Sequence, residues 1–353
     1  MKLSLDVFPD RGPNEISPAD YYREALDLTE FAEEMGYSSV KIVEHYFYDY
    51  GGYSPNPLIF LAAVARRTQT MRLMTGAVLP VFSHPLKLAA ELAMLDGISD
   101  GRLDAGFARA FLPGEFKNFQ RDMEESRGRF DEGMEIILRA WEGKRFSHQG
   151  KFFQFEDVIS VPPVTQKPRP PVWIAAVASR QSFINAGKNG FNLMVVPYIG
   201  PYDEIKADIE AYKQAYREAG HGEPSKEQIM VVMHTIVADS HDEAVNIAQP
   251  ALAHYLKTFK EGAAPYAQTE TKEYAKYSGI GALLDSMTWE KMTSERRIAV
   301  GTPDEVADIL SYIADFFGSE FLSLQQFFGG ITFAQAKRNI ELTAREVLPQ
   351  LQK

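Results

Sequence analysis

The chain alternates between short runs of apolar, often β-branched residues and longer segments in which apolar residues recur every three or four positions. The short runs are typical of buried strands, and the longer periodic segments are typical of amphipathic helices. We predict strands at residues 3–8, 38–43, 71–79, 103–108, 172–177, 193–196, 228–237 and 321–324. We predict helices at residues 18–36, 57–68, 85–97, 131–141, 183–190, 202–218, 242–256 and 333–351, and one that begins at 303.

This order of elements predicts an α/β fold. Strands separated by helices are expected to be parallel, with right-handed crossovers. Eight strand candidates with no βα unit missing favour a closed (β/α)8 TIM barrel over an open doubly wound sheet. We expect a single domain over residues 1–353 with two insertions: a hairpin and proline-rich connector at about 144–171, and a long mobile lid after the seventh strand at about 260–297.

Composition narrows the class of protein. The chain of 353 residues is 45% hydrophobic and carries a net charge of −11, which argues against a nucleic-acid or anionic-membrane surface. No apolar run approaches the ~18 residues of a membrane span, and the first residues do not resemble a signal peptide, so we expect a cytoplasmic protein. The chain has no cysteine, which excludes disulfides, thiolate nucleophiles and cysteine-ligated metals.

The strand at 38–43 ends in Glu44 and His45, which precede three aromatic residues and the pair Gly51-Gly52. Parallel α/β proteins keep their active sites at the carboxyl ends of strands, so this acid and imidazole are candidate catalytic groups. Two structural alternatives remain open at this point. Glu44 could cap a neighbouring helix, and His45 could be a hydrogen-bonded core histidine.

Arg109 follows the strand at 103–108, and Ser179 and Ser182 open the helix after the strand at 172–177. Taken singly, Arg109 could form a surface ion pair, and Ser179 or Ser182 could simply cap the helix. Taken together at one barrel mouth, where His234 could also lie, they favour a phosphate site, because a guanidinium and a helix N-terminus both donate to anions. We expect no metal site, since the histidines lack ligand spacing and no H-E-x-x-H motif occurs. The glycine motif of Rossmann enzymes is also absent.

Several motifs together resemble the bacterial luciferase-like flavin monooxygenases, of the alkanal monooxygenase alpha-chain type. The resemblance spans nearly the whole chain in order and spacing. It rests on residues 42–47 (IVEHYF), Gly51-Gly52, 76–80 (GAVLP), His84-Pro85, 95–102 (LDGISDGR), 106–109 (GFAR), 171–176 (PVWIAA), 300–303 (VGTP) and 347–349 (VLP).

The resemblance implies that the chain binds reduced FMN (FMNH2), supplied by a separate NAD(P)H:flavin reductase. It also implies that O2 reacts at the flavin to give a C4a-(hydro)peroxide, which oxygenates a small organic substrate. By the same resemblance, His45 is the active-site histidine, Glu44 its neighbouring acid, and Arg109, Ser179 and Ser182 hold the FMN phosphate. Thr75 and Gly76 would lie under the flavin ring, where a cis peptide is common, and Ala108, Phe111, Ala176 and Ala178 would also line the cofactor.

Ala108 and Ala178 stand where luciferase has a cysteine and a glutamate, which argues against light emission. We expect an aromatic wall of Tyr46, Phe47, Phe107 and Phe111 to exclude water from the reacting flavin.

Two alternatives differ in function: a deazaflavin (F420) hydride-transfer enzyme of the same superfamily, and a non-catalytic flavin-binding partner subunit. The substrate class, an aldehyde or a natural-product intermediate, stays open. We expect a homodimer that pairs through the helices at 57–68 and 85–97.

Overall fold

The computed structural model describes residues 1–177 and 179–352. Within these residues, eight parallel strands close into a barrel, which confirms the predicted TIM-barrel fold. The barrel strands are β1 (Lys2–Val7), β2 (Ser39–Ile42), β3 (Arg72–Thr75), β4 (Leu103–Phe107), β7 (Val172–Ala176), β8 (Asn192–Val195), β9 (Ile229–Val237) and β11 (Phe321–Phe327).

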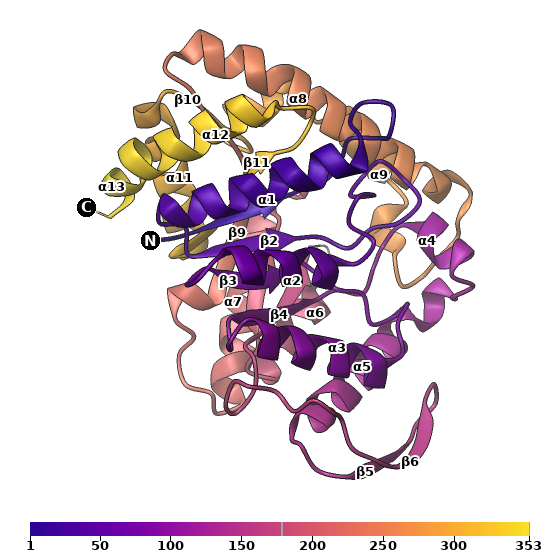
Figure 1. Cartoon of the computed structure of the whole chain (residues 1–353). Helices are drawn as coiled ribbons and strands as arrows, with labels where there is room; N and C mark the ends of the chain where they lie inside the picture. Colours follow the sequence, from indigo (N-terminus) through magenta and orange to yellow (C-terminus); the bar gives the residue numbers. More distant parts are fainter. Residues whose placement is uncertain (178, 353) are drawn as a thin grey trace.

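The barrel closes because β11 pairs with both β9 and β1, while β8 pairs with β9. Helices surround the strands on the outside, and the two ends of the chain lie near each other (Figure 1). The helices of the described chain are α1 (Pro18–Glu34), α2 (Pro57–Arg67), α3 (Pro85–Ile98), α4 (Pro113–Asn118), α5 (Ser126–Trp141), α6 (Arg180–Lys188), α7 (Tyr202–Glu218), α8 (His241–Ala263), α9 (Ile280–Asp285), α10 (Trp289–Ser294), α11 (Pro303–Phe317), α12 (Phe333–Leu342) and α13 (Leu348–Leu351). None of the described helices is both long enough and apolar enough to cross a membrane.

Side chains alternate along the barrel strands between the helical layer and the barrel interior. In β1, for example, Leu3, Leu5 and Val7 belong to the large apolar core shared with the helices, whereas Ser4 and Asp6 do not. A second apolar cluster inside the barrel comprises Met74, Ala77, Trp173, Met194, Met230 and Phe321. The strands therefore present a continuous apolar face to the helices and a mixed face to the interior.

Several elements differ from the sequence-based prediction. The third strand was expected to reach Leu79 but ends at Thr75, and the following Gly76–Ala77 peptide bond is cis, as the resemblance implied. The short helix α4 was not predicted. A short extra strand, β10 (Ala299–Gly301), pairs with the end of β9 and is too short to show a periodic pattern.

The expected hairpin is formed by β5 (Phe146–Gln149) and β6 (Gln154–Val158), and it extends away from the barrel (Figure 1). Its turn is held by Glu132 of α5, whose carboxylate accepts the backbone N–H groups of Phe152 and Phe153. This partly buried carboxylate fixes the insertion against the helical layer.

The lid segment, residues 260–297, consists of short helical pieces that include α9 and α10. It packs over the carboxyl end of β4. The Tyr274 hydroxyl donates to the carbonyl oxygen of Ala110 at 3.0 Å, and the Tyr266 hydroxyl donates to that of Phe111. The segment thus covers the barrel mouth, and its mobility stays a prediction.

Candidate active site

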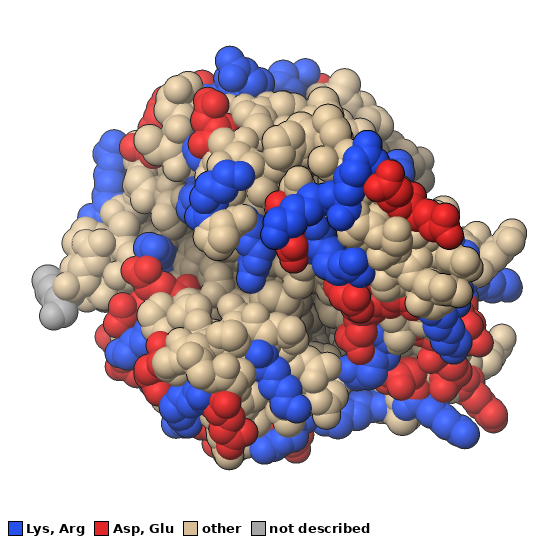
Figure 2. Space-filling view, turned by 90° about the horizontal axis from the view of Figure 1, so that it is seen from below, with Lys and Arg blue, Asp and Glu red and all other residues tan. Residues whose placement is uncertain are grey.

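A cavity of about 830 Å³ opens at the carboxyl ends of the barrel strands. Its wall combines the segments that follow β2, β3, β4, β7 and β8 with lid residues 272–277. One face of the molecule is hollowed near its centre and carries basic and acidic side chains interspersed around the hollow (Figure 2). The cavity is where parallel barrels place their active sites.

His45 lies in this wall and is held by a carboxylate that the sequence did not identify. Its Nδ1 lies 3.0 Å from Oε1 of Glu115, which is fully buried at the start of α4. The same oxygen accepts the backbone N–H of Tyr46 at 2.9 Å. Because a carboxylate accepts hydrogen bonds, this network assigns a proton to Nδ1 of His45. The other ring nitrogen, Nε2, has no hydrogen-bond partner among the described residues.

The backbone after His45 has to turn back closely on the ring. Gly51 has φ +72°, and a Cβ at this position would lie 2.7 Å from Cδ2 of His45. Glycine therefore supplies both the left-handed conformation and the space. The His45 ring packs against Tyr50, Phe111 and Phe8 at centroid distances of 5.1, 5.8 and 6.4 Å.

Glu44 also lines the cavity, and it is 6% exposed. Its carboxylate accepts the Tyr46 hydroxyl at 2.6 Å and the backbone N–H of Leu79 at 3.2 Å. Burial raises the pKa of Glu44 to about 7, and these hydrogen bonds only partly oppose the shift. Glu44 thus links the segment after β2 to the segment after β3.

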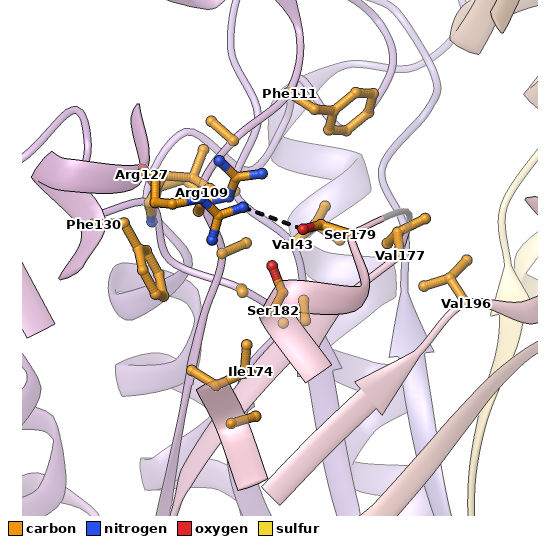
Figure 3. Close-up of a pocket in the computed structure, with 18 of the residues that line it drawn as sticks. Val43, Arg109, Phe111, Arg127, Phe130, Ile174, Val177, Ser179, Ser182 and Val196 are labelled. Atoms are coloured by element: carbon orange, nitrogen blue, oxygen red, sulfur yellow. Dashed lines mark hydrogen bonds between the residues drawn. The ribbon is translucent and has the colours of Figure 1, made fainter. Parts of the chain in front are cut away.

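Arg109 and Arg127 converge on one side of the cavity (Figure 3). Arg127 donates to the Ser179 hydroxyl at 3.1 Å. Both guanidinium groups contact Oε2 of Glu273 from the lid, at 2.9 Å for Arg109 and 3.3 Å for Arg127. Ser182 lies beside them on the first turn of α6, whose N-cap is Ser179. The two guanidinium groups therefore share one lid carboxylate, and the Ser179 hydroxyl and the first turn of α6 lie next to them.

A further part of the cavity wall is aromatic. Phe8, Tyr50, Phe111 and Phe259 line it, and the Phe111 ring stacks on Tyr277 of the lid at 5.6 Å. Of the four residues that the sequence placed in an aromatic wall, only Phe111 lines the cavity.

The other three members of that wall lie elsewhere. Tyr46 is tied to Glu44, Phe47 is 57% exposed, and Phe107 packs outside the barrel near Trp141. Strand alternation explains Phe107, because its neighbour Ala108 is the one that faces inward.

Most predicted site residues meet at this cavity: Glu44, His45, Gly76, Ala108, Arg109, Phe111, Ser179 and Ser182 all line it. Two predicted residues do not. Thr75 is buried, with its hydroxyl bonded to the backbone of Gly106, and Ala176 faces the helical layer while its neighbour Ala175 faces the cavity. Ala178 lies outside the described residues.

His234 is fully buried below the cavity wall. Its ring lies between Tyr198, Tyr255 and Phe328 at 4.5 to 4.6 Å, and burial lowers its pKa to about 3. It is therefore a neutral interior group, and the structure does not place it at the mouth. In the described part of the chain, no cluster of three or more His, Asp or Glu side chains could hold a metal ion.

Sequence reasoning missed Glu115 and Arg127. Glu115 follows Pro113-Gly114, which is typical of a turn, and Arg127 begins a helix whose start was placed later. Neither residue ends a strand, so the rule that located His45 and Arg109 could not find them.

Comparisons with known proteins agree with this architecture. A family model described as luciferase-like monooxygenase matches residues 1–319. The chain is 40% identical to the solved monooxygenase RslO1 from Streptomyces bottropensis, with a TM-score of 0.89 over 99% of both chains. It is 34% identical over 246 residues, 69% of this chain and 67% of the relative, to the oxygenase component of the flavin-dependent trigonelline monooxygenase of Acinetobacter baylyi.

A third similarity concerns the fold alone. The oxygenating constituent of 3,6-diketocamphane monooxygenase from Pseudomonas putida, a type II Baeyer–Villiger monooxygenase solved with FMN, has a TM-score of 0.82 at 21% identity, covering 99% of this chain and 98% of that one. The resemblance inferred from the motifs is thus confirmed, and the chain belongs to the luciferase-like monooxygenase family.

Proposed function

We propose that this chain is the oxygenase component of a two-component flavin monooxygenase. It takes reduced FMN from a separate flavin reductase and uses O2 to oxygenate a small organic substrate held in the same cavity. Two relatives support the proposal by name: one is the oxygenase component of a flavin-dependent monooxygenase, and one was solved with FMN. The volume of about 830 Å³ suits a cofactor together with a small substrate.

The observation that carries the proposal is the anion site on one wall of the cavity. Arg109, Arg127, Ser179 and Ser182 converge there, and the Glu273 carboxylate already bridges both guanidinium groups. Guanidinium forks and helix N-termini are well suited to a phosphate. The residues therefore fit the phosphate end of FMN.

Another part of the wall fits a flat ring system. Gly76, Ala77 and Ala108 are small residues that line the cavity there. A Cβ on Gly76 would lie 2.2 Å from Cγ of Lys41, so a larger residue could not be placed without moving that side chain. When bound, the reduced flavin would supply the electrons and the site of oxygen activation.

The side chains of this protein would position the reacting groups, shield them from water and exchange protons with them. The Glu115 carboxylate holds the His45 ring in one orientation and keeps the proton on Nδ1. Nε2 is then the atom at which His45 can take up or release a proton. The aromatic wall and the lid residues Tyr274 and Tyr277 would exclude water, which favours transfer of oxygen to the substrate over release of hydrogen peroxide.

The first test measures cofactor binding. Wild-type protein should bind FMN more tightly than riboflavin, which lacks the phosphate. Arg127→Leu should remove most of this preference, whereas Arg129→Leu, on the same helix but outside the cavity wall, should keep it. Equal binding of FMN and riboflavin by the wild type would contradict the phosphate assignment.

The second test measures chemistry. With a flavin reductase, NADH, FMN and 18O2, a panel of aldehydes and polycyclic ketones should yield a product that carries one 18O atom. Binding of F420 in place of FMN, with hydride transfer and no oxygen consumption, would support the dehydrogenase alternative instead. Flavin binding with no oxygen chemistry would support a non-catalytic role.

A further inference from the structure

The barrel interior beneath the cavity is polar on one side. Three adjacent strands, β11, β1 and β2, place Gln325, Asp6 and Lys41 in one row, since Asp6 is the register partner of both other residues. All three line the cavity and are at most 4% exposed. We call this row the barrel floor. A row of serines, Ser323, Ser4 and Ser39, lies one layer deeper on the same strands.

The floor contains a buried ion pair. Nζ of Lys41 lies 2.7 Å from Oδ2 of Asp6, with side chains 5% and 1% exposed. Burial raises the pKa of Asp6, and Lys41 opposes the shift. A buried ion pair usually needs further hydrogen bonds to offset the loss of hydration. Here the pair stands at the end of an open cavity, where a ligand can provide them.

The protein itself leaves several of these polar atoms without partners. Among the described residues, Asp6 Oδ1, Gln325 Nε2 and the hydroxyls of Ser4, Ser39 and Ser323 have no hydrogen-bond partner. Buried polar groups are nearly always hydrogen-bonded, so each unpartnered group calls for an explanation. The serines lie below the cavity wall, but Asp6 and Gln325 face into it.

The donors and acceptors of the floor determine which type of ligand it can bind. Lys41 and Gln325 offer N–H donors, and Asp6 offers a carboxylate acceptor. Because the charges of Lys41 and Asp6 cancel, the floor exerts no net electrostatic attraction on a charged ligand. The complementary group is neutral and has a carbonyl oxygen beside an N–H or O–H donor. Examples are a primary amide, a lactam and a hydroxy ketone.

The depth of the floor also limits the size of the ligand. Phe8 follows Asp6 by two residues, and its ring lies 6.4 Å from that of His45. A strand rises ~3.3 Å per residue, so the floor lies roughly 7 Å below this aromatic layer. That distance is about the length of one six-membered ring. A ligand bound to the floor would place its apolar part among Phe8, Tyr50 and Phe111, next to His45.

We propose that the barrel floor is a substrate subsite that binds a neutral carbonyl group with an adjacent hydrogen-bond donor, carried on an aromatic or other apolar body. As a substrate subsite it rests on the proposed function. It sets which part of the substrate points down into the barrel and which part faces His45. Gln325 is then a specificity-determining residue.

The test compares two probes of the same shape. Benzamide has the carbonyl and the donor, whereas acetophenone has a methyl group in place of the amide nitrogen. Affinities are measured by titration calorimetry or ligand-observed NMR on the full chain, with and without saturating FMN. Wild-type protein should bind benzamide about tenfold more tightly than acetophenone, because sites built for a donor discriminate against analogues that lack it.

Gln325→Leu should reduce this preference to less than about threefold, while Gln214→Leu, the same change on the exposed side of α7, should leave it unchanged. Gln325→Leu should fold normally, because it removes an unpartnered buried amide. The double variant Asp6→Leu/Lys41→Met replaces the ion pair with apolar residues and is a second test of the floor. It too should lose the preference.

Three results would overturn the proposal. These are equal affinities of the wild type for both probes, a preference that survives in Gln325→Leu, and displacement of FMN by benzamide together with weaker FMN binding by Gln325→Leu. The third result would assign the floor to the pyrimidine edge of the flavin. Failure of the wild type to bind FMN would contradict the proposed function, yet the benzamide preference can still be measured without FMN.

Discussion

Glu273 of the lid occupies the place that the proposed FMN phosphate would take. Its Oε2 atom lies 2.9 Å from Arg109 and 3.3 Å from Arg127. Phosphate binding therefore has to displace this carboxylate or share the two guanidinium groups with it. We predict that Glu273→Gln, which removes the charge and keeps the shape, binds FMN more tightly than the wild type.

The size of the effect follows from burial. The side chains of Arg109, Arg127 and Glu273 are 12%, 26% and 29% exposed, so the contact lies between a surface ion pair and a buried one. Exposed pairs contribute up to about 1 kcal/mol, and a carboxylate that bridges two partly buried cations should contribute roughly 1 to 2 kcal/mol. At 1.4 kcal/mol per tenfold change, FMN affinity should rise by about fivefold to thirtyfold.

The assay is a fluorescence titration of FMN, with riboflavin as a matched ligand that lacks the phosphate. Riboflavin affinity should be the same in Glu273→Gln and wild type. Glu270→Gln is the matched protein control, because it removes an exposed lid charge that has no ion pair among the described residues. The gain for FMN should shrink as salt is raised, since these groups are partly open to solvent.

An unchanged or weaker FMN affinity in Glu273→Gln would show that Glu273 does not compete with the phosphate. An equal gain in Glu270→Gln would also argue against this competition, because general lid charge would then be responsible. A gain for riboflavin as well as FMN would show that the lid controls access to the whole cavity and does not compete with the phosphate.

Three further predictions test other parts of the structure. Glu115→Gln should lower kcat at least tenfold while FMN affinity stays within twofold, because a neutral amide accepts the Nδ1–H of His45 more weakly than a carboxylate and no longer stabilises the protonated ring. Imidazole rescue of His45→Ala but not of Glu115→Gln would assign the two roles, and an unchanged kcat would exclude Glu115. Glu44 has a pKa raised from 4.5 to about 7, so folding favours its protonated form and the wild type should lose stability as pH rises through this window. Relative to Glu44→Gln, the loss should be roughly 3 kcal/mol between about pH 4.5 and pH 8, measured by urea unfolding, and parallel pH profiles would contradict the assignment. Ile59 of α2 and Met94 of α3 are apolar side chains that are 71% and 57% exposed. Ile59→Asp/Met94→Lys should therefore convert the expected homodimer to a monomer, as measured by light scattering. A monomeric wild type would contradict this expectation.

The candidate site was only partly predictable from the sequence. His45 and Arg109 were found because each lies just after a predicted strand, and Ser182 because it opens the helix after one; a barrel brings these strand ends together. Glu115 lies on the short, unpredicted helix α4, and Arg127 lies at the start of α5, before the periodic segment at 131–141, so no periodic pattern marked the direction of either side chain. Thr75 and Ala176 were placed at the cofactor by resemblance, but their side chains face away from the cavity.

Local sequence patterns were enough to predict the order of the elements along this chain. Short apolar runs and periodic segments located eight barrel strands, and the polar residues after the runs marked the functional end of the barrel. These features depend on neighbours in the chain, so they can be deduced from spacing.

Contacts between groups far apart in the chain became visible only in the folded barrel. Glu115 reaches His45 across 70 positions, and Glu273 reaches Arg109 across 164. The barrel floor likewise joins Gln325 to Asp6 and Lys41 only because β11 closes against β1. Such contacts depend on closure of the whole barrel and on the path of its insertions, which no local pattern encodes.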